Sequence, residues 1–150
     1  MLESLSLDGK SVVITGGGTG LGRAMVRDMA RAGANLVIAG RRTGPIEEAA
    51  AEAVSLGVDA TSVATDVTDS SQVANLMKTC LDRFGKIDVL LNNAGAVSDN
   101  VRKPIWEHTD EEWDRIMRVN LTGAFYCARE VSQTMMAQEH GKISNGAPGW

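Results

Sequence analysis

Short apolar runs alternate with longer amphipathic segments along this chain, and this alternation restricts the folds that it can adopt. Because a helical segment separates each predicted strand from the next, neighbouring strands would run parallel, with the helices crossing over both faces of the sheet. We therefore expect an α/β fold built on a doubly wound parallel sheet. The predicted strands lie at residues 11–15, 35–39, 60–65 and 87–91, and a fifth begins at 142–143. The predicted helices lie at residues 21–32, 45–56, 69–84 and 109–140.

Residue spacing also predicts the buried faces and the starts of the helices. The apolar residues of the first helix share one face, which should pack against the sheet. They are Leu21, Ala24, Met25, Met29 and Ala32. Asp69 with Gln72, and Thr109 with Glu112, have the spacing of a capping box, in which the two side chains bond to each other's backbone N–H groups.

The composition is that of one globular domain. The chain has 150 residues, 43% of them hydrophobic, and a net charge of −4, so we expect a single domain over residues 1–150. No apolar run approaches the roughly 18 residues of a membrane span, no signal peptide pattern opens the chain, and no basic stripe suggests a nucleic-acid partner. Cys80 and Cys127 fall in helical patterns without metal-ligand spacing. We therefore expect buried, reduced thiols, no metal and a cytoplasmic protein.

A glycine-rich turn joins the first strand to the first helix. Residues 15–22 read Thr-Gly-Gly-Gly-Thr-Gly-Leu-Gly. Without side chains in the way, backbone N–H groups can approach a phosphate, and the helix N-terminus adds its partial positive charge. Gly22 would let the helix pack close to the sheet. The turn therefore predicts a dinucleotide site, with a turn of no chemical purpose as the alternative.

Two arginines follow the second predicted strand and bear on the choice of cofactor. NAD-selective folds usually place a carboxylate at about this point to hold the ribose 2′-hydroxyl. Here Gly40 occupies the position, Arg41 and Arg42 follow, and no acid appears before Glu47. Guanidinium groups suit a 2′-phosphate, so we predict NADP rather than NAD. Two solvated surface arginines are the alternative.

Four motifs in fixed order give the chain its resemblance to a known family. They are the turn at residues 15–22, Asp66-Val67 after the third strand, Asn92-Asn93-Ala94-Gly95 after the fourth, and Val119-Asn120 in the last helix. In this order they resemble the short-chain dehydrogenases/reductases from about residue 7 to about residue 143. The resemblance implies a Rossmann fold.

The resemblance also implies roles for single residues. The aspartate that matches Asp66 accepts a hydrogen bond from the adenine amino group, with the Val67 backbone beside it; helix capping is the alternative role for Asp66. The backbone at Ala94 and Gly95 passes close to the ribose. Asn120 matches an asparagine that holds a water in the proton relay, so it is the predicted catalytic residue, with a satisfied core amide as the alternative. The residues predicted to bind the cofactor are Thr15, Gly16, Thr19, Gly20, Leu21, Gly22, Arg41, Arg42, Asp66, Val67, Asn93, Ala94, Gly95 and Val119.

The chain departs from the family pattern near its C-terminus. In the family a serine ends the fifth strand, and a Tyr-x-x-x-Lys motif follows. The one tyrosine of this chain, Tyr126, comes too soon after Asn120, and Glu130 stands where the lysine would be. We therefore expect Tyr126 to be a packing residue. Alignment from Gly141 places the expected serine near Pro148. These departures predict a single dinucleotide-binding domain that is truncated at its C-terminus.

Together these observations predict the cofactor-binding portion of an NADP-dependent oxidoreductase. Such an enzyme transfers a hydride between nicotinamide and a small-molecule carbonyl or alcohol, and residues 1–150 alone should have no appreciable activity. A catalytically inactive nucleotide-binding or interaction module is the alternative. Members of the family commonly assemble through the helix that matches residues 109–140, so the resemblance also implies a homo-oligomer.

Overall fold

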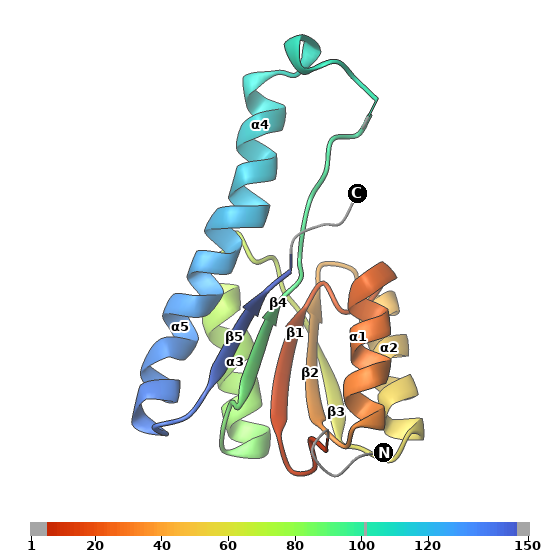
Figure 1. Cartoon of the computed structure of the whole chain (residues 1–150), viewed down its shortest axis with the longest axis vertical. Helices are drawn as coiled ribbons and strands as arrows, with labels where there is room; N and C mark the ends of the chain where they lie inside the picture. The colour runs from red at the N-terminus through yellow and green to blue at the C-terminus, as the bar shows by residue number, and fades with distance from the viewer. Residues whose placement is uncertain (1–5, 101, 147–150) are drawn as a thin grey trace.

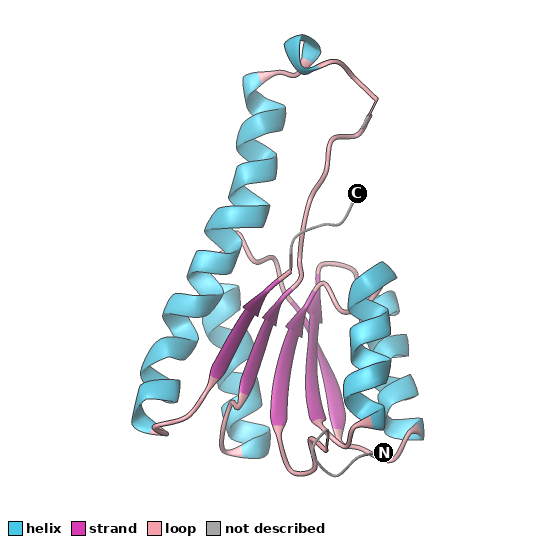
Figure 2. Cartoon of the chain, in the orientation of Figure 1, coloured by secondary structure: helices cyan, strands magenta, loops and turns pink. Residues whose placement is uncertain are grey.

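The computed structural model describes residues 6–100 and 102–146, which form a parallel sheet with helices on both faces (Figure 1, Figure 2). The strands are β1 (Ser11–Thr15), β2 (Asn35–Gly40), β3 (Ala60–Ala64), β4 (Val89–Asn92) and β5 (Lys142–Asn145). The helices are α1 (Gly20–Arg31), α2 (Thr43–Ser55), α3 (Ser70–Phe84), α4 (Asp110–Met117) and α5 (Gly123–Ala137), with a 3₁₀ turn, η2 (Ile105–Glu107), and a π-helical turn, η3 (Arg118–Thr122). The predicted α/β fold is confirmed.

The sheet has the order β3-β2-β1-β4-β5, and each neighbouring pair is parallel. Side chains of a strand alternate between the two faces. Val12 and Ile14 of β1 therefore pack under α1 and α2, whereas Val13 packs with α3 and α5 on the other face. All strands end at one edge of the sheet, and the chain changes its direction of winding between β1 and β4 (Figure 2). Ligands of open α/β sheets bind at such a switch point.

The buried face of α1 differs from the predicted one. Its fully buried residues are Gly22, Val26 and Ala30, whereas Leu21 is 56% exposed. Met25 and Met29 contact the core from its border. The prediction included Ala24 and Ala32, which are half-buried, and omitted Gly22, Val26 and Ala30, which are buried.

The starts of α3 and α4 form only half of each predicted capping box. The Asp69 side chain accepts from the N–H groups of the first turn of α3, and Thr109 Oγ1 accepts from Glu112 N at 3.2 Å. The side chain of the second partner does not bond to the N-cap N–H in either case, although Gln72 Nε2 donates to the Asp69 carboxylate at 3.1 Å. Gln72 Oε1 accepts from Asp66 N at 2.8 Å, and the Glu112 carboxylate points toward the preceding loop.

The predicted helix at residues 109–140 is divided into α4, η3 and α5. The π turn η3 contains Asn120, whose side chain bonds to the loop after β4 instead of filling a place in the apolar stripe. Gly123 follows and packs so closely on Val67 that a Cβ at this position would lie 2.6 Å from Val67 Cγ2. Single π turns within α-helices occur often at functional sites.

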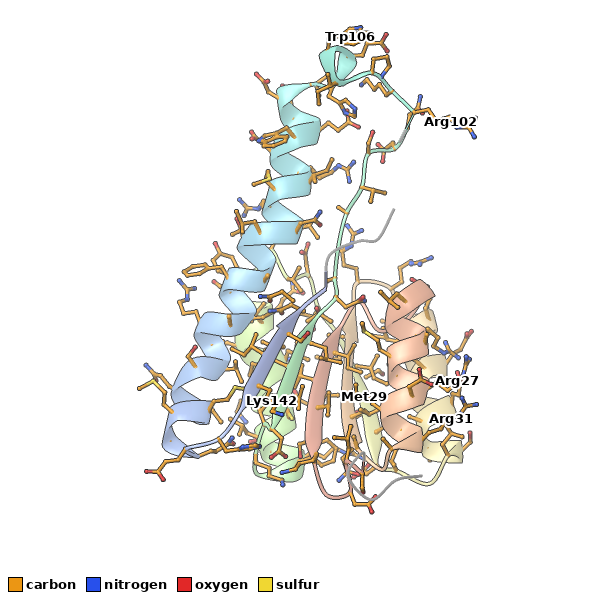
Figure 3. The ribbon with its side chains drawn as sticks, in the orientation of Figure 1. Arg27, Met29, Arg31, Arg102, Trp106 and Lys142 are labelled. Carbon is orange, nitrogen blue, oxygen red and sulfur yellow. The ribbon has the colours of Figure 1, made fainter. Side chains whose placement is uncertain are left out.

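The loop between β4 and α4, residues 93–109 without residue 101, projects with α4 beyond the carboxyl edge of the sheet (Figure 1). Trp106 lies at the far end of this projection and is 81% exposed (Figure 3).

Among the described residues, no helix is long and apolar enough to cross a membrane, and no group of three or more potential ligands could hold a metal ion. Cys80 and Cys127 are buried and free, as predicted.

Candidate cofactor-binding site

A cavity of about 490 Å³ opens at the carboxyl edge of the sheet, within the size range of small-molecule sites. It is lined by Gly16, Gly18, Thr19, Ala39, Gly40, Arg41, Arg42, Pro45, Ile46, Thr65, Asp66, Val67, Ala94, Gly95 and Val119. The lining comes from the end of β2, from the segments that directly follow β1, β2, β3 and β4, and from Val119 in η3. The cavity therefore spans the switch point of the sheet.

The glycine-rich turn packs tightly between α1 and the end of β4. Gly16 has a φ of +66°, and a Cβ there would lie 2.9 Å from Ala94 Cα. A Cβ on Gly22 would overlap the carbonyl oxygen of Gly16 and lie 2.5 Å from Asn93 Nδ2. Both glycines are therefore required by close backbone approach, as predicted for Gly22.

Thr15 and Asn93 support the cavity from behind. Thr15 Oγ1 accepts from the N–H groups of Asn93 and Ala94, at 3.1 and 3.0 Å. Asn93 Nδ2 in turn donates to the carbonyl oxygens of Thr15 and Gly16, at 3.2 and 3.1 Å. These bonds tie the end of β1 to the end of β4. Both residues were predicted to bind the cofactor, but the structure places them outside the cavity lining.

The N-terminus of α1 faces the cavity without a side-chain cap. Thr19 is its N-cap residue, with an extended backbone, and its side chain makes no capping hydrogen bond. Helix starts present unpaired N–H groups and partial positive charge, which suit an anion. Gly20, Leu21 and Gly22 form this first turn but do not line the cavity. Of the predicted residues of the turn, Gly16 and Thr19 do line it.

Arg41 and Arg42 stand at the rim of the cavity, directly after β2, and both are exposed. Pro45 and Ile46, from the first turns of α2, continue the same wall. Among the described residues that line the cavity, Asp66 is the one carboxylate. The rim near β2 is thus positively charged, and exposed guanidinium groups can reach an anion without large desolvation.

Asp66 is held by a short turn after β3. Its Oδ1 accepts from Thr68 N at 2.9 Å and from Thr68 Oγ1 at 2.8 Å. Helix α3 is capped by Asp69, so the alternative role of Asp66 as the helix cap is not observed. The pKa of Asp69 is lowered, because the Ser71 hydroxyl and then the backbone N–H groups of the first turn donate to its carboxylate. Asp66 and Val67 therefore remain free to line the cavity.

Asn120 lies beside the main cavity and not in its lining. Its Oδ1 accepts from Ala96 N at 2.6 Å, and its Nδ2 donates to Ala96 O at 2.9 Å. It also lines a second, smaller cavity with Asn92 and Asn145, whose side chains bond to each other at 3.0 Å. The amide of Asn120 is thus paired with the backbone N–H and carbonyl of Ala96, which fixes the loop just after the cavity wall.

Several lining residues were missed by the sequence analysis. They are Gly18, Ala39, Gly40, Pro45, Ile46 and Thr65. The rule that ligands bind beyond the carboxyl ends of parallel strands indicates Ala39, Gly40 and Thr65. Pro45 and Ile46 reach the cavity because of the way α2 packs on the sheet, which no sequence motif reports.

Tyr126 packs on the core formed with α3, and Arg129 Cζ lies 5.0 Å from its ring centroid. Its predicted packing role agrees with this position. Ser144 lies in β5, paired with Leu91, and its side chain is exposed. Pro148, near which the family's serine would align, lies outside the described residues.

Proteins similar in sequence to this chain are described as dehydrogenases or oxidoreductases. A family model described as short chain dehydrogenase matches residues 10–146. An uncharacterized oxidoreductase of Thermotoga maritima is 40% identical over 93% of this chain and 53% of its own length. A sorbitol dehydrogenase of Cereibacter sphaeroides is 39% identical over 95% of this chain and 54% of its own. The chain spans about half the length of these curated relatives.

Solved structures show the same likeness. An NAD⁺-bound xylitol dehydrogenase superposes with a TM-score of 0.86, at 32% identity, over 91% of this chain and 52% of that one. A metagenomic short-chain oxidoreductase in complex with NADP gives a TM-score of 0.83, at 31% identity, over 91% of this chain and 61% of that one. Structures similar to this chain therefore include both NAD and NADP complexes.

Proposed function

Because the chain belongs to the short chain dehydrogenase family, we propose that it is the cofactor-binding portion of an NADP-dependent oxidoreductase. The observation that carries this proposal is the cavity in which the glycine-rich turn, Asp66 and two arginines meet. The bound nicotinamide would supply the hydride chemistry between a carbonyl and an alcohol carbon. The residues of this chain would bind the cofactor and fix its orientation.

The pyrophosphate is proposed to lie on the turn at residues 15–22. The tight packing of Gly16 and Gly22 supports this role, since it leaves backbone N–H groups and the start of α1 facing the cavity. Thr15 and Asn93 would position the turn, and Thr19, Gly20 and Leu21 would supply its N–H groups. Backbone bonds of this kind do not depend on the titration of any side chain.

The adenosine end is proposed to lie between the carboxyl ends of β2 and β3. Asp66 would accept from the adenine amino group, with Val67 beside it, while Arg41 and Arg42 would bind a 2′-phosphate. Since similar structures hold NAD or NADP, the choice of NADP rests on this chain's own arginines. They lie at the cavity rim, where no described carboxylate other than Asp66 takes part in the lining.

The reactive end is proposed to lie near the loop after β4. Ala94, Gly95 and Val119 would flank the nicotinamide riboside, and Asn120 would take part in the proton relay. In support of this, the side-chain amide of Asn120 bonds to Ala96, the residue after Gly95 of the cavity lining. The substrate of the whole protein would be a small carbonyl or alcohol compound, in the cytoplasm and without a membrane or nucleic-acid partner.

A homo-oligomer through α4 and α5 is part of the proposal. Large apolar side chains are exposed along this helical segment, among them Trp113 of α4, Leu121 of η3 and Phe125 of α5, which are 59%, 61% and 54% exposed. Monomeric proteins rarely expose contiguous apolar patches of large size. Light scattering coupled to size-exclusion chromatography measures the state directly.

A second candidate function is a nucleotide-binding module without chemistry. The position of Tyr126 supports such a module, because this tyrosine packs on the core and, among the described residues, no tyrosine lines the cavity. The two functions differ in turnover. Binding of NADPH without oxidation in the presence of ketones would support the module, whereas turnover above background would support the enzyme.

Titration of the purified chain with NADPH and with NADH tests the proposed function. We expect NADPH to bind more tightly, and the double substitution Arg41→Ala/Arg42→Ala should lower its affinity about ten-fold or more, the effect of losing charge-assisted bonds, while sparing NADH. Arg31→Ala, at the end of α1 away from the cavity, is the control (Figure 3). Equal affinities for the two cofactors would contradict the NADP assignment, and no binding of either would contradict the function.

A further inference from the structure

The loop after β4 leaves the cofactor cavity and runs along α4 (Figure 1). Ala94 and Gly95 still line the cavity, and the next residue, Ala96, is bound through both its N–H and its carbonyl to Asn120. Arg115 Nη2 donates to Val97 O at 3.2 Å. Residues of the helical segment thus hold consecutive peptide groups of the loop.

Glu112 joins this loop to α4 at three further points. Its Oε1 accepts from the Ser98 hydroxyl, and its Oε2 accepts from Lys103 Nζ at 3.2 Å and lies 3.0 Å from His108 Nδ1. The three partners come from the start, the middle and the end of the described loop. The Glu112 side chain is only 14% exposed, so most of its surface is taken up by these contacts.

The contacts of Glu112 are those of an ionised carboxylate. The Ser98 hydroxyl lowers its pKa, burial opposes this, and Lys103 and His108 lower it further, to about 2. The other ring nitrogen of His108 lies 3.2 Å from Lys103 O, so the ring bridges the Glu112 carboxylate and the Lys103 backbone. Carboxylate hydrogen bonds to such donors are stronger than neutral ones.

The carboxylate of Glu112 therefore serves the loop and not the helix end. Thr109 caps α4 through the backbone N–H of Glu112, which does not involve the Glu112 side chain. Its neighbour Glu111 is exposed, and no hydrogen bond or ion pair of its side chain is seen among the described residues. Removal of the Glu112 carboxylate would thus release the loop while the cap of α4 remained.

We propose that Glu112 is a positioning residue, which locks the loop after β4 onto α4 and so fixes Ala96 and Val97 where Asn120 and Arg115 reach them. The loop enters this arrangement directly from the cofactor wall at Gly95. The consequence for catalysis rests on the proposed function, whereas the locking of the loop does not.

Hydrogen exchange of the 150-residue chain tests the lock. In Glu112→Gln, the loop amides that donate hydrogen bonds, at residues 96, 100, 102, 103, 107 and 108, should exchange about ten-fold faster or more, the effect of losing one charge-assisted bond. Glu111→Gln is the matched control, because it removes the same charge from the same helical turn. Amides of β1 should not change in either variant. No acceleration in Glu112→Gln, an equal acceleration in Glu111→Gln, or a parallel rise in β1 would each overturn the proposal.

A second variant keeps the test valid if Glu112→Gln folds poorly. Ser98→Ala removes the bond to Glu112 from the loop side, together with the two bonds between the Ser98 hydroxyl and the Asn100 backbone. It is therefore read at the same amides except that of Asn100, and their exchange should accelerate by a smaller factor than in Glu112→Gln. In the double variant, Ser98→Ala should add little to Glu112→Gln, because its partner is already lost. Fully additive effects would show that the two residues act separately and would overturn the lock. NADPH titration of the same samples is independent: a wild-type chain that bound no NADPH would contradict the proposed function but leave the exchange result standing.

Discussion

The substitution Gly16→Val should weaken NADPH binding by about ten-fold or more. A φ of +66° at this position costs an L-residue roughly 1–2 kcal/mol. The new Cβ would also lie 2.9 Å from Ala94 Cα and 3.0 Å from Ala94 N. Because both atoms are backbone, the turn itself must move, and overpacking of this kind typically costs about 1–3 kcal/mol. If the shift removes one phosphate bond of about 1.5–3 kcal/mol, affinity falls about ten- to hundred-fold.

Two other glycines serve as controls for this substitution. Gly57 has a φ of +96° but open space around it, in the turn between α2 and β3. Gly57→Ala should lower stability by about 1 kcal/mol and leave NADPH affinity unchanged. Gly44 has neither constraint, so Gly44→Ala should change neither quantity appreciably.

Calorimetric titration measures affinity, on variants whose folding is checked by circular dichroism and thermal unfolding. A folded Gly16→Val variant that bound NADPH with wild-type affinity would refute the assignment of the phosphates to this turn. An equal loss of affinity in Gly57→Ala would show that backbone strain anywhere in the fold is enough, and would refute it as well.

Three further predictions concern the core and the chemistry. Burial raises the pKa of the Asp88 carboxyl, but the hydrogen bond from the Ser11 N–H and the charges of nearby lysines outweigh burial, so the pKa is lowered. The ionised carboxylate therefore stabilises the folded protein above the pKa of the unfolded state, and this stabilisation is lost as the pH falls through the pKa of the folded state. Asp88→Asn should thus lower the free energy of unfolding by about 1–3 kcal/mol at pH 7, with a gap that closes below about pH 4 in urea titrations; a gap that stayed constant with pH would contradict this. Burial, and then the charge of Asp88, raise the pKa of the Cys80 thiol to about 12, so it should react with an aromatic disulfide reagent only as fast as the protein unfolds; rapid labelling of folded protein would disagree. Because Tyr126 packs on the core, the 150-residue chain should oxidise NADPH at background rate with diketone, sugar-acid and enoyl-thioester substrates, whereas a rate that depended on Asn120 and survived Tyr126→Phe would identify a different proton donor.

Much of the fold could be predicted from residue patterns. The near-continuous apolar runs at β1, β2 and β4 are buried on both faces, so their signal is strong. The turn at residues 15–22 also predicts the location of the cavity, since its glycines are required by local backbone approach. The buried face of α1 could not be predicted in the same way. Leu21 is more apolar than Gly22, but a Cβ on Gly22 would overlap the carbonyl oxygen of Gly16, so the contact face of α1 is glycine at that point and Leu21 is 56% exposed.

The remaining site features depend on tertiary contacts. Glu112 fits a capping box by spacing, but three donors from the loop compete successfully for its carboxylate. The π turn around Asn120 likewise reflects the bond to Ala96, from a segment distant in the sequence. Pro45 and Ile46 line the cavity because of how α2 docks. Motifs describe local geometry, whereas the contacts of Asn120 with Ala96 and of Glu112 with Ser98 join residues 24 and 14 positions apart.

The central claim, that the cavity at the carboxyl edge binds the dinucleotide, is tested most directly by the footprint of NADPH in hydrogen exchange. On binding, exchange should slow at the amides of four segments that make up or adjoin the cavity lining: residues 15–22, residues 40–46 apart from Pro45, residues 65–67 and residues 94–95. Amides of β5 and of the far end of α5, which lie outside it, should keep their rates. Saturation with NADPH that left the four segments unchanged, or that slowed exchange mainly elsewhere, would contradict the claim.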